Sequence, residues 1–82
     1  MADPTDPVVA RSRDEIDALD RAILAALNRR VEVVRELHDH KQRSGYPMVD
    51  EGREQRMVES LRATNAGPID DDGVEALVRA VI

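Results

Sequence analysis

The pattern of apolar and polar positions predicts one long helix in the first half of the chain. Between Ser12 and Ser44 there is neither proline nor glycine, and Ala, Leu, Glu and Arg, which favour helices, predominate. Ser12 and Glu15 have the spacing of a capping box, and Gly45 followed by Pro47 ends the helix. Apolar residues recur at steps of three and four, as on one face of a helix. This apolar stripe consists of Ile16, Leu19, Ile23, Leu27, Val34 and Leu37.

Two shorter helices are predicted to follow. The second has Asp50 as its N-cap and runs to about Thr64, and the residues of 65–68 (Asn-Ala-Gly-Pro) are typical of a turn. The third starts at the acidic run 70–72, because carboxylates stabilise a helix N-terminus. Its apolar stripe continues to the last residue without a capping signal, so this helix is expected to be cut short at Ile82. No strand pattern competes with these helices.

The Asp-Pro pairs at 3–4 and 6–7 are typical of chain breakers, so the predicted organisation is a flexible N-terminal tail, residues 1–11, followed by one helical domain, residues 12–82. The fold class is all-α, with three helices per chain. At 1.5 Å per residue the first helix is about 50 Å long, whereas a compact chain of this size is about 30 Å across. The long helix therefore has to pack against something outside its own chain. The simplest partner is the same helix of a second copy, in an intertwined antiparallel homodimer.

Composition excludes several classes of function. The chain has no cysteine, one aromatic residue and a net charge of −5. These values exclude disulfides and thiol nucleophiles, and they argue against a nucleic-acid partner, which would require a basic or aromatic surface. No apolar run approaches the roughly 20 residues of a membrane span, and the N-terminus lacks the features of an export signal. We therefore expect a cytoplasmic protein with no membrane partner and, since no metal-ligand spacing is found, no metal.

Two cations interrupt the apolar stripe of the long helix. Arg30 falls at the stripe position between Leu27 and Val34, and Lys41 falls at the position after Leu37. Lys41 is the only lysine among 12 basic residues. A buried cation is costly unless it is paired, so either internal carboxylates or an anionic ligand should meet them. Alternatively, both side chains extend from the edge of the stripe into solvent. The two positions lie about 16 Å apart along one face, from which long side chains can converge on a small dianion.

The second helix carries a similar group of charges. Its apolar stripe, followed backwards by helical turns, reaches Glu54 and then Asp50, with Arg53 beside them. Asp50 alone is best explained as a helix cap, whereas Arg53 and Glu54 are compatible with either a solvated first turn or a site. Gly52 costs about 1 kcal/mol of helix propensity early in this helix, and it is expected to leave this wall of the possible site mobile.

Together, these positions resemble the all-helical chorismate mutases over residues 12–82. The resemblance rests on an ordered set of short motifs, none of which is specific alone. In chain order the set is Arg13, the run Ile16-Asp17-Ala18-Leu19-Asp20, Arg29-Arg30, Lys41 and the run Asp50-Glu51-Gly52-Arg53-Glu54.

The resemblance implies a role for each matching residue. Arg30 and Arg53 would hold the two carboxylates of chorismate, together with Arg13 donated by the partner subunit. Lys41 would donate to the ether oxygen of the bond that breaks, and Glu54 would meet the ring hydroxyl. The implied catalytic residues are therefore Lys41, Arg30 and Glu54, and the implied substrate-binding residues are Arg13, Arg30, Lys41, Asp50, Arg53 and Glu54.

Helix geometry supports one of these assignments independently. Arg13 and Arg30 are about 25 Å apart along one helix. They can share a site only if Arg13 comes from an antiparallel second chain, as the length argument also requires.

The implied reaction is the intramolecular rearrangement of chorismate to prephenate, in the biosynthesis of Phe and Tyr. It requires no nucleophile, proton transfer, metal or cofactor. In the family the third helix continues past the position of Ile82 and supplies a hydroxyl and an amide or acid to the site. Two alternatives remain: an isochorismate-pyruvate lyase with the same fold and cations, and a non-catalytic helical module that dimerises and docks onto a shikimate-pathway synthase.

Overall fold

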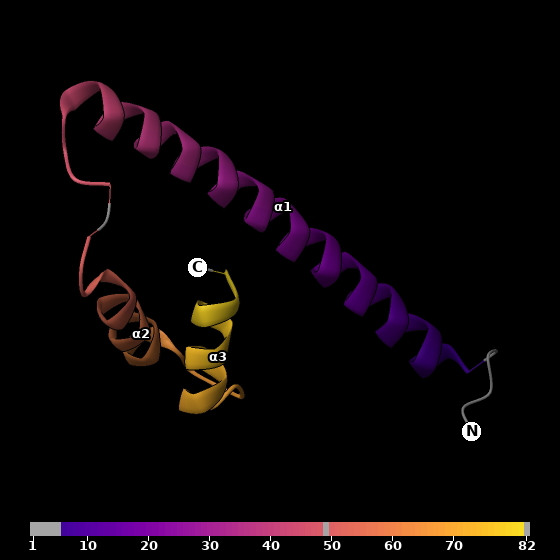
Figure 1. Ribbon diagram of the computed structural model, residues 1–82. Helices are drawn as coiled ribbons and strands as arrows, with labels where there is room; N and C mark the ends of the chain where they lie inside the picture. Colours follow the sequence, from indigo (N-terminus) through magenta and orange to yellow (C-terminus); the bar gives the residue numbers. More distant parts are fainter. Residues whose placement is uncertain (1–5, 49, 82) are drawn as a thin grey trace. The chain divides into compact units, whose positions relative to one another are not determined.

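The computed structural model describes residues 6–48 and 50–81 of the 82-residue chain (Figure 1). Within these residues there are three helices and no strands: α1, Pro7–Ser44; α2, Arg53–Thr64; and α3, Asp71–Val81. The predicted all-α class with three helices is confirmed. The chain divides into two units, Met1–His40 and Lys41–Ile82. No helix of the described residues is both long enough and apolar enough to cross a membrane.

Helix α1 begins earlier than the sequence predicted. Asp6 is its N-cap: the Asp6 Oδ1 atom accepts a hydrogen bond from the amide of Val8 at 2.8 Å, and the Asp6 carbonyl accepts one from Ala10 at 3.0 Å. Pro7 occupies the first helical position, where its fixed φ and missing N–H are favourable. The predicted start at Ser12 was therefore wrong, and residues 7–11 are helical rather than a flexible tail. Residues 1–5 of that predicted tail lie outside the described residues.

The end of α1 follows the prediction. Gly45 has φ 73°, and the amide of Tyr46 donates to the carbonyl of Lys41 at 3.0 Å. This is the long bond of a Schellman motif, in which a left-handed glycine ends the helix.

The apolar stripe of α1 is not buried within the chain. No residue of α1 is buried, and Ile16, Leu19 and Ile23 are each more than half exposed. The helix has 38 residues and is about 57 Å long at 1.5 Å per residue. An exposed apolar face of this length is typical of an interaction surface.

The start of α2 differs from the prediction as well. Its N-cap is Gly52, which has φ 80° and provides no side-chain cap, so the prediction of Asp50 as N-cap was wrong. The amide of Arg53 donates to the carbonyl of Asp50 at 3.3 Å, which closes a tight turn before the helix. Since Gly52 precedes the helix in a left-handed conformation that glycine adopts readily, the expected cost to helix propensity does not arise there.

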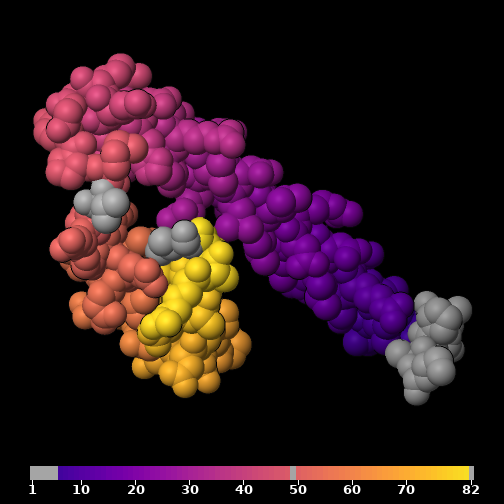
Figure 2. Space-filling model, in the orientation of Figure 1, coloured from indigo at the N-terminus to yellow at the C-terminus, as the bar shows by residue number. Residues whose placement is uncertain are grey.

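Helices α2 and α3 pack against each other, as the orange and yellow parts of Figure 2 show. Their apolar contact is small: Val58 of α2 and Val74 and Val78 of α3 are the buried residues of the described chain. The predicted turn between the helices is confirmed, since the Asn65 side chain accepts from the Gly67 amide and donates to the Ile69 carbonyl.

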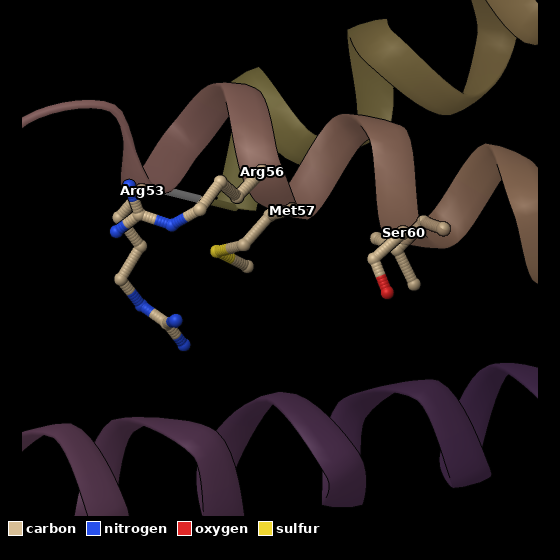
Figure 3. A pocket seen from close by; sticks show the side chains of 5 residues that line it. Arg53, Arg56, Met57 and Ser60 are labelled. Carbon is tan, nitrogen blue, oxygen red and sulfur yellow. The ribbon is translucent and has the colours of Figure 1, made fainter.

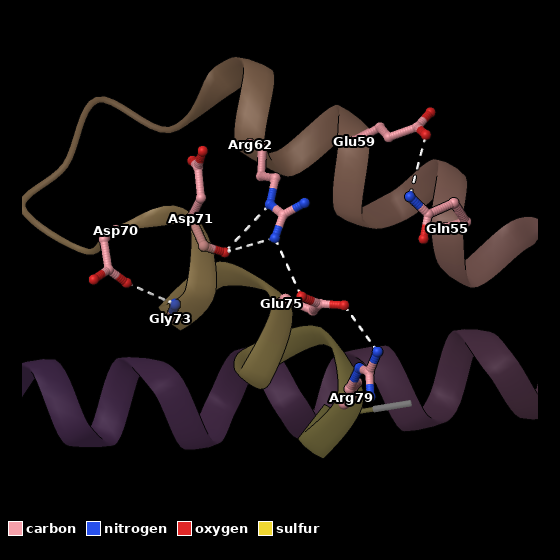
Figure 4. Close-up of polar contacts among 8 residues, drawn as sticks. All are labelled: Gln55, Glu59, Arg62, Asp70, Asp71, Gly73, Glu75 and Arg79. Atoms are coloured by element: carbon pink, nitrogen blue, oxygen red, sulfur yellow. Dashed lines mark hydrogen bonds and ion pairs between the residues drawn. The ribbon is translucent and has the colours of Figure 1, made fainter.

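Polar contacts reinforce this pair of helices (Figure 4). Asp70 caps α3 by accepting a hydrogen bond from the amide of Gly73 at 2.8 Å, so the acidic run starts this helix as predicted. Arg62 of α2 donates to the carbonyl of Asp71 and forms an ion pair with Glu75 at 3.2 Å. The prediction that α3 is cut short at Ile82 lies outside the described residues.

Candidate active site

Lys41 lies in a shallow hollow formed by the end of α1 and the segment before α2. Lys41 is partly buried on the last turns of α1, and the Schellman cap places Tyr46 and Pro47 beside it. Asp50 and Glu51 complete the lining of this hollow, which we call the Lys41 hollow. The structure therefore brings together two of the predicted site residues, Lys41 and Asp50.

The carboxylate of Asp50 is held by an arginine from α2. Arg56 Nη2 lies 2.8 Å from Asp50 Oδ1, and Arg56 Nη1 donates to the carbonyl of Glu51 at 3.4 Å. The hydrogen bond from Arg56 lowers the pKa of Asp50 below its usual value of 3.8, and the positive charges of Arg56, Lys41 and Arg53 act in the same direction. Asp50 is consequently an anion at neutral pH.

Arg53 lies in a second hollow, along one side of α2 (Figure 3). The side chains of Arg53, Met57 and Ser60 extend from the same side of the helix, as expected for positions one and two turns apart. Arg56 and Leu61 complete the lining of this Arg53 hollow. A guanidinium beside apolar side chains in such a setting is suited to binding a carboxylate through two parallel hydrogen bonds.

Glu54 lines neither hollow. It lies one helical turn before Val58, which is buried, and two turns before Leu61, which lines the Arg53 hollow. Glu54 therefore does not join Lys41 and Asp50 in the Lys41 hollow.

Arg13 and Arg30 both lie on α1 and are also separate from each other in one chain. Because the helix is continuous from Pro7 to Ser44, they are about 25 Å apart along its axis. Arg30 is partly buried, whereas its neighbour Arg29 is exposed and forms an ion pair with Glu32 at 3.0 Å. The adjacent arginines thus have different environments.

Within residues 6–48 and 50–81, no carboxylate forms an ion pair with Arg30 or Lys41, the cations of the apolar stripe. The same holds there for Arg13 and Arg53, the other residues predicted to bind carboxylates. Arg29, Arg56, Arg62 and Arg79 form the arginine ion pairs of this part of the chain. The side chains without a hydrogen bond or ion pair there include Arg13, Arg30, Lys41 and Arg53. The first sequence alternative, neutralisation by internal carboxylates, is therefore not met within the described chain.

Sequence reasoning missed Arg56. The sequence analysis did not single out this residue, whose guanidinium contacts Asp50 and Glu51. The sequence does contain a signal for this contact. Arg56 lies in the first turn of the helix, and the acidic pair Asp50-Glu51 precedes that helix, within reach of a long side chain. Tyr46 was also missed, although its position directly after Gly45 fixes it in the helix cap.

Comparison with known proteins identifies the family. The family model described as chorismate mutase type II matches residues 12–82. The chain belongs to this family. The resemblance inferred from the sequence motifs is thereby confirmed.

Solved chorismate mutase structures have the same fold. Chorismate mutase from Thermus thermophilus in form I is 32% identical in sequence and superposes with a TM-score of 0.83, covering 89% of this chain and 91% of that one. Form II gives a TM-score of 0.82 at 32% identity, covering 89% and 83%. The chorismate mutase fold therefore extends over most of the chain.

A curated relative is longer. The T-protein of Enterobacter agglomerans is 37% identical over 71 residues, which is 85% of this chain and 19% of the T-protein. The chain thus spans about a fifth of the length of that relative, and the similarity concerns that portion alone.

Proposed function

We propose that this protein is a chorismate mutase that catalyses the rearrangement of chorismate to prephenate in the biosynthesis of Phe and Tyr. Family membership supports the reaction. The structural observation that carries the proposal is that Lys41 and Arg30, on the apolar face of α1, have no carboxylate partner among the described residues. Cations in this position remain available to a substrate that carries two carboxylates.

The chemistry needs positioning and charge rather than proton transfer. In this rearrangement the ether C–O bond breaks while a C–C bond forms in the same molecule, so every atom and electron of the product comes from the substrate. The ether oxygen gains negative charge as its bond breaks. In our proposal the Lys41 ammonium donates a hydrogen bond to this oxygen, where a fixed donor stabilises the transition state more than the ground state.

The arginines hold the substrate in its reactive shape. Arg30, Arg53 and the partner subunit's Arg13 bind the two carboxylates, since a guanidinium fork matches a carboxylate in geometry and charge. Fixing both carboxylates favours the compact chair-like conformer in which the ends of the new bond are close. Glu54 meets the ring hydroxyl, and Asp50 forms part of the wall beside Lys41.

The proposal includes an intertwined antiparallel homodimer in the cytoplasm. Two observations on α1 support the dimer: its apolar stripe is exposed in a single chain, and Arg13 and Arg30 are about 25 Å apart on one helix. In an antiparallel pair, Arg13 of one chain can lie near Arg30 of the other. The dimer is tested by sedimentation at micromolar concentration, where a folded monomer of 9.1 kDa would contradict it.

Turnover of two related substrates tests the function. The purified chain is incubated separately with chorismate and with isochorismate, and the loss of each substrate and the appearance of prephenate or pyruvate are followed. We expect loss of chorismate and formation of prephenate. Release of pyruvate from isochorismate would instead indicate an isochorismate-pyruvate lyase. If a folded dimer leaves both substrates unchanged, the alternative of a non-catalytic module that docks onto a shikimate-pathway synthase is favoured.

A further inference from the structure

Arg56 connects the two hollows of the candidate site. Its side chain lines the Arg53 hollow, and its guanidinium contacts two consecutive residues of the Lys41 hollow. The contacts are the ion pair with Asp50 at 2.8 Å and the hydrogen bond donated to the carbonyl of Glu51 at 3.4 Å. One side chain thus fixes both the carboxylate and the backbone of the segment that faces Lys41.

The backbone between Asp50 and Arg56 is shaped to accept this guanidinium. The Arg53 amide donates to the carbonyl of Asp50, and the Arg56 amide donates to the carbonyl of Gly52 at 3.0 Å. Gly52 has φ 80°, and a Cβ atom at this position would lie 3.1 Å from Arg56 Nη1. The glycine therefore permits both the left-handed turn and the close approach of the guanidinium.

The charge of Asp50 has consequences for Lys41, because both residues line the same hollow. Asp50 is an anion at neutral pH and would attract the Lys41 ammonium if it had no other partner. When a lysine is paired with a carboxylate, its N–H groups donate to that carboxylate and its positive charge is partly offset. It then stabilises negative charge on a substrate oxygen less well. Arg56 supplies a partner of opposite charge, whereas Arg53, whose charge also acts on Asp50, makes no ion pair with it.

We propose that Arg56 is a positioning residue that holds Asp50 against α2 as its counter-ion and thereby leaves the Lys41 ammonium free for the substrate. The inference rests on the proposed function for the role of Lys41 in catalysis. Stability does not account for the contact, because the Arg56 and Asp50 side chains are 57% and 49% exposed and exposed ion pairs contribute little to folding. For the same reason, variants of Arg56 are expected to fold.

The first experiment uses Lys41 itself as the probe. Since it is the only lysine, isotope-labelled lysine gives a single side-chain signal in NMR, which is recorded at one fixed pH without any substrate. In Arg56→Gln the released Asp50 should pair with Lys41, so the ammonium signal of Lys41 should change its chemical shift and its protons should exchange with water more slowly. The signal should remain at the wild-type position in Arg56→Lys, which keeps the charge. The matched control is Arg79→Gln, which removes an exposed ion pair with Glu75 on α3 and should also leave the Lys41 signal unchanged.

The second experiment measures kcat and KM for chorismate in the same variants. Arg56→Gln should lower kcat by about tenfold, which is a smaller effect than removal of a donor that itself contacts the substrate. The change in KM should be smaller than the change in kcat. Arg56→Lys should recover most of this loss, and Arg79→Gln should match the wild type. In an Asp50→Asn background the substitution of Arg56 should have little further effect, because the carboxylate that it restrains is gone.

The outcomes separate this inference from the proposed function. An unchanged Lys41 signal in Arg56→Gln, or an equal loss of activity in Arg79→Gln, would overturn the role of Arg56 even in an active enzyme. If the Lys41 signal changes as expected but the wild-type protein does not convert chorismate, the charge relationship stands and the proposed function fails.

Discussion

The backbone carbonyl of Lys41 accepts a hydrogen bond from the amide of Tyr46 at 3.0 Å. This bond closes the cap of α1 around Gly45, whose φ of 73° lies in the left-handed region. The residue proposed to act on the ether oxygen is therefore also an anchor of the helix end. Its side chain projects from the last turns of α1, whose end is fixed by this hydrogen bond and by the left-handed conformation of Gly45.

Gly45 should be sensitive to the addition of a side chain. No atom lies within 4 Å of the Cβ position at Gly45, so the effect of Gly45→Ala is purely conformational. We expect a loss of about 1–2 kcal/mol in the free energy of unfolding, measured by urea denaturation. Gly45→Asn is the control, because asparagine tolerates the left-handed conformation better, and its loss should be smaller. Equal stability of the alanine variant and the wild type would contradict this explanation of the cap.

Arg62 and Arg79 both pair with Glu75 but should contribute differently to stability. Arg62 crosses from α2 to α3 and is 31% exposed, whereas Arg79 lies on the same helix as Glu75 and is 68% exposed. Arg62→Ala should lower the free energy of unfolding by about 1 kcal/mol, because hydrogen bonds between the two helices are lost. Arg79→Ala should cost at most about 0.5 kcal/mol. Urea denaturation of the two variants side by side checks this order, and the reverse order would contradict it.

The ion pair of Asp50 predicts a specific dependence of stability on pH. The pKa of Asp50 is lower in the folded protein than its usual value of 3.8, so the folded state releases this proton more readily than the unfolded state. Its contribution to stability is therefore complete above the usual pKa and is lost as the pH falls through the lowered pKa. Denaturation of wild type and Asp50→Asn across this range should show a difference that shrinks toward low pH. A difference that grows toward low pH would contradict the assignment.

Much of the helical arrangement could be predicted from the sequence because it depends on local signals. The stripe of α1 and the glycine that ends this helix follow from residue spacing and backbone preference. The start of α1 was missed because Asp6-Pro7 was interpreted as a chain breaker, whereas aspartate followed by proline is also a favourable N-cap and first residue. The choice between these interpretations depends on whether the residues that follow continue the helix.

The site was predictable in its cations but not in its contacts. Arg30 and Lys41 stand out because they interrupt an apolar stripe. Asp50 was taken for a helix cap because a lone aspartate before a helix usually serves that purpose. Its actual partner, Arg56, lies farther along the chain, and only the conformation of the intervening turn brings the two side chains together. Periodicity contains no information about such a contact.

A site shared between two chains predicts complementation between inactive variants. Arg13→Ala and Lys41→Ala should each be poorly active alone, since every site in either homodimer lacks one cation. When the two are unfolded and refolded together, each mixed dimer should contain one intact site, so activity should recover to about a quarter of the wild-type value. The control is each variant refolded alone. No recovery in a mixture shown to contain mixed dimers would place Arg13 in the site of its own chain.

The most direct test of the account is the kcat of Lys41→Ala for chorismate. If the ammonium stabilises charge on the ether oxygen, kcat should fall by about 10²–10³-fold or more while the helical fold persists. Lys41→Gln, which keeps a donor without the charge, should be intermediate at best, and Lys41→Arg should also be poor because its fork is larger than a point charge. A kcat for Lys41→Ala within about threefold of the wild-type value, well under 1 kcal/mol of barrier, would contradict the proposed mechanism.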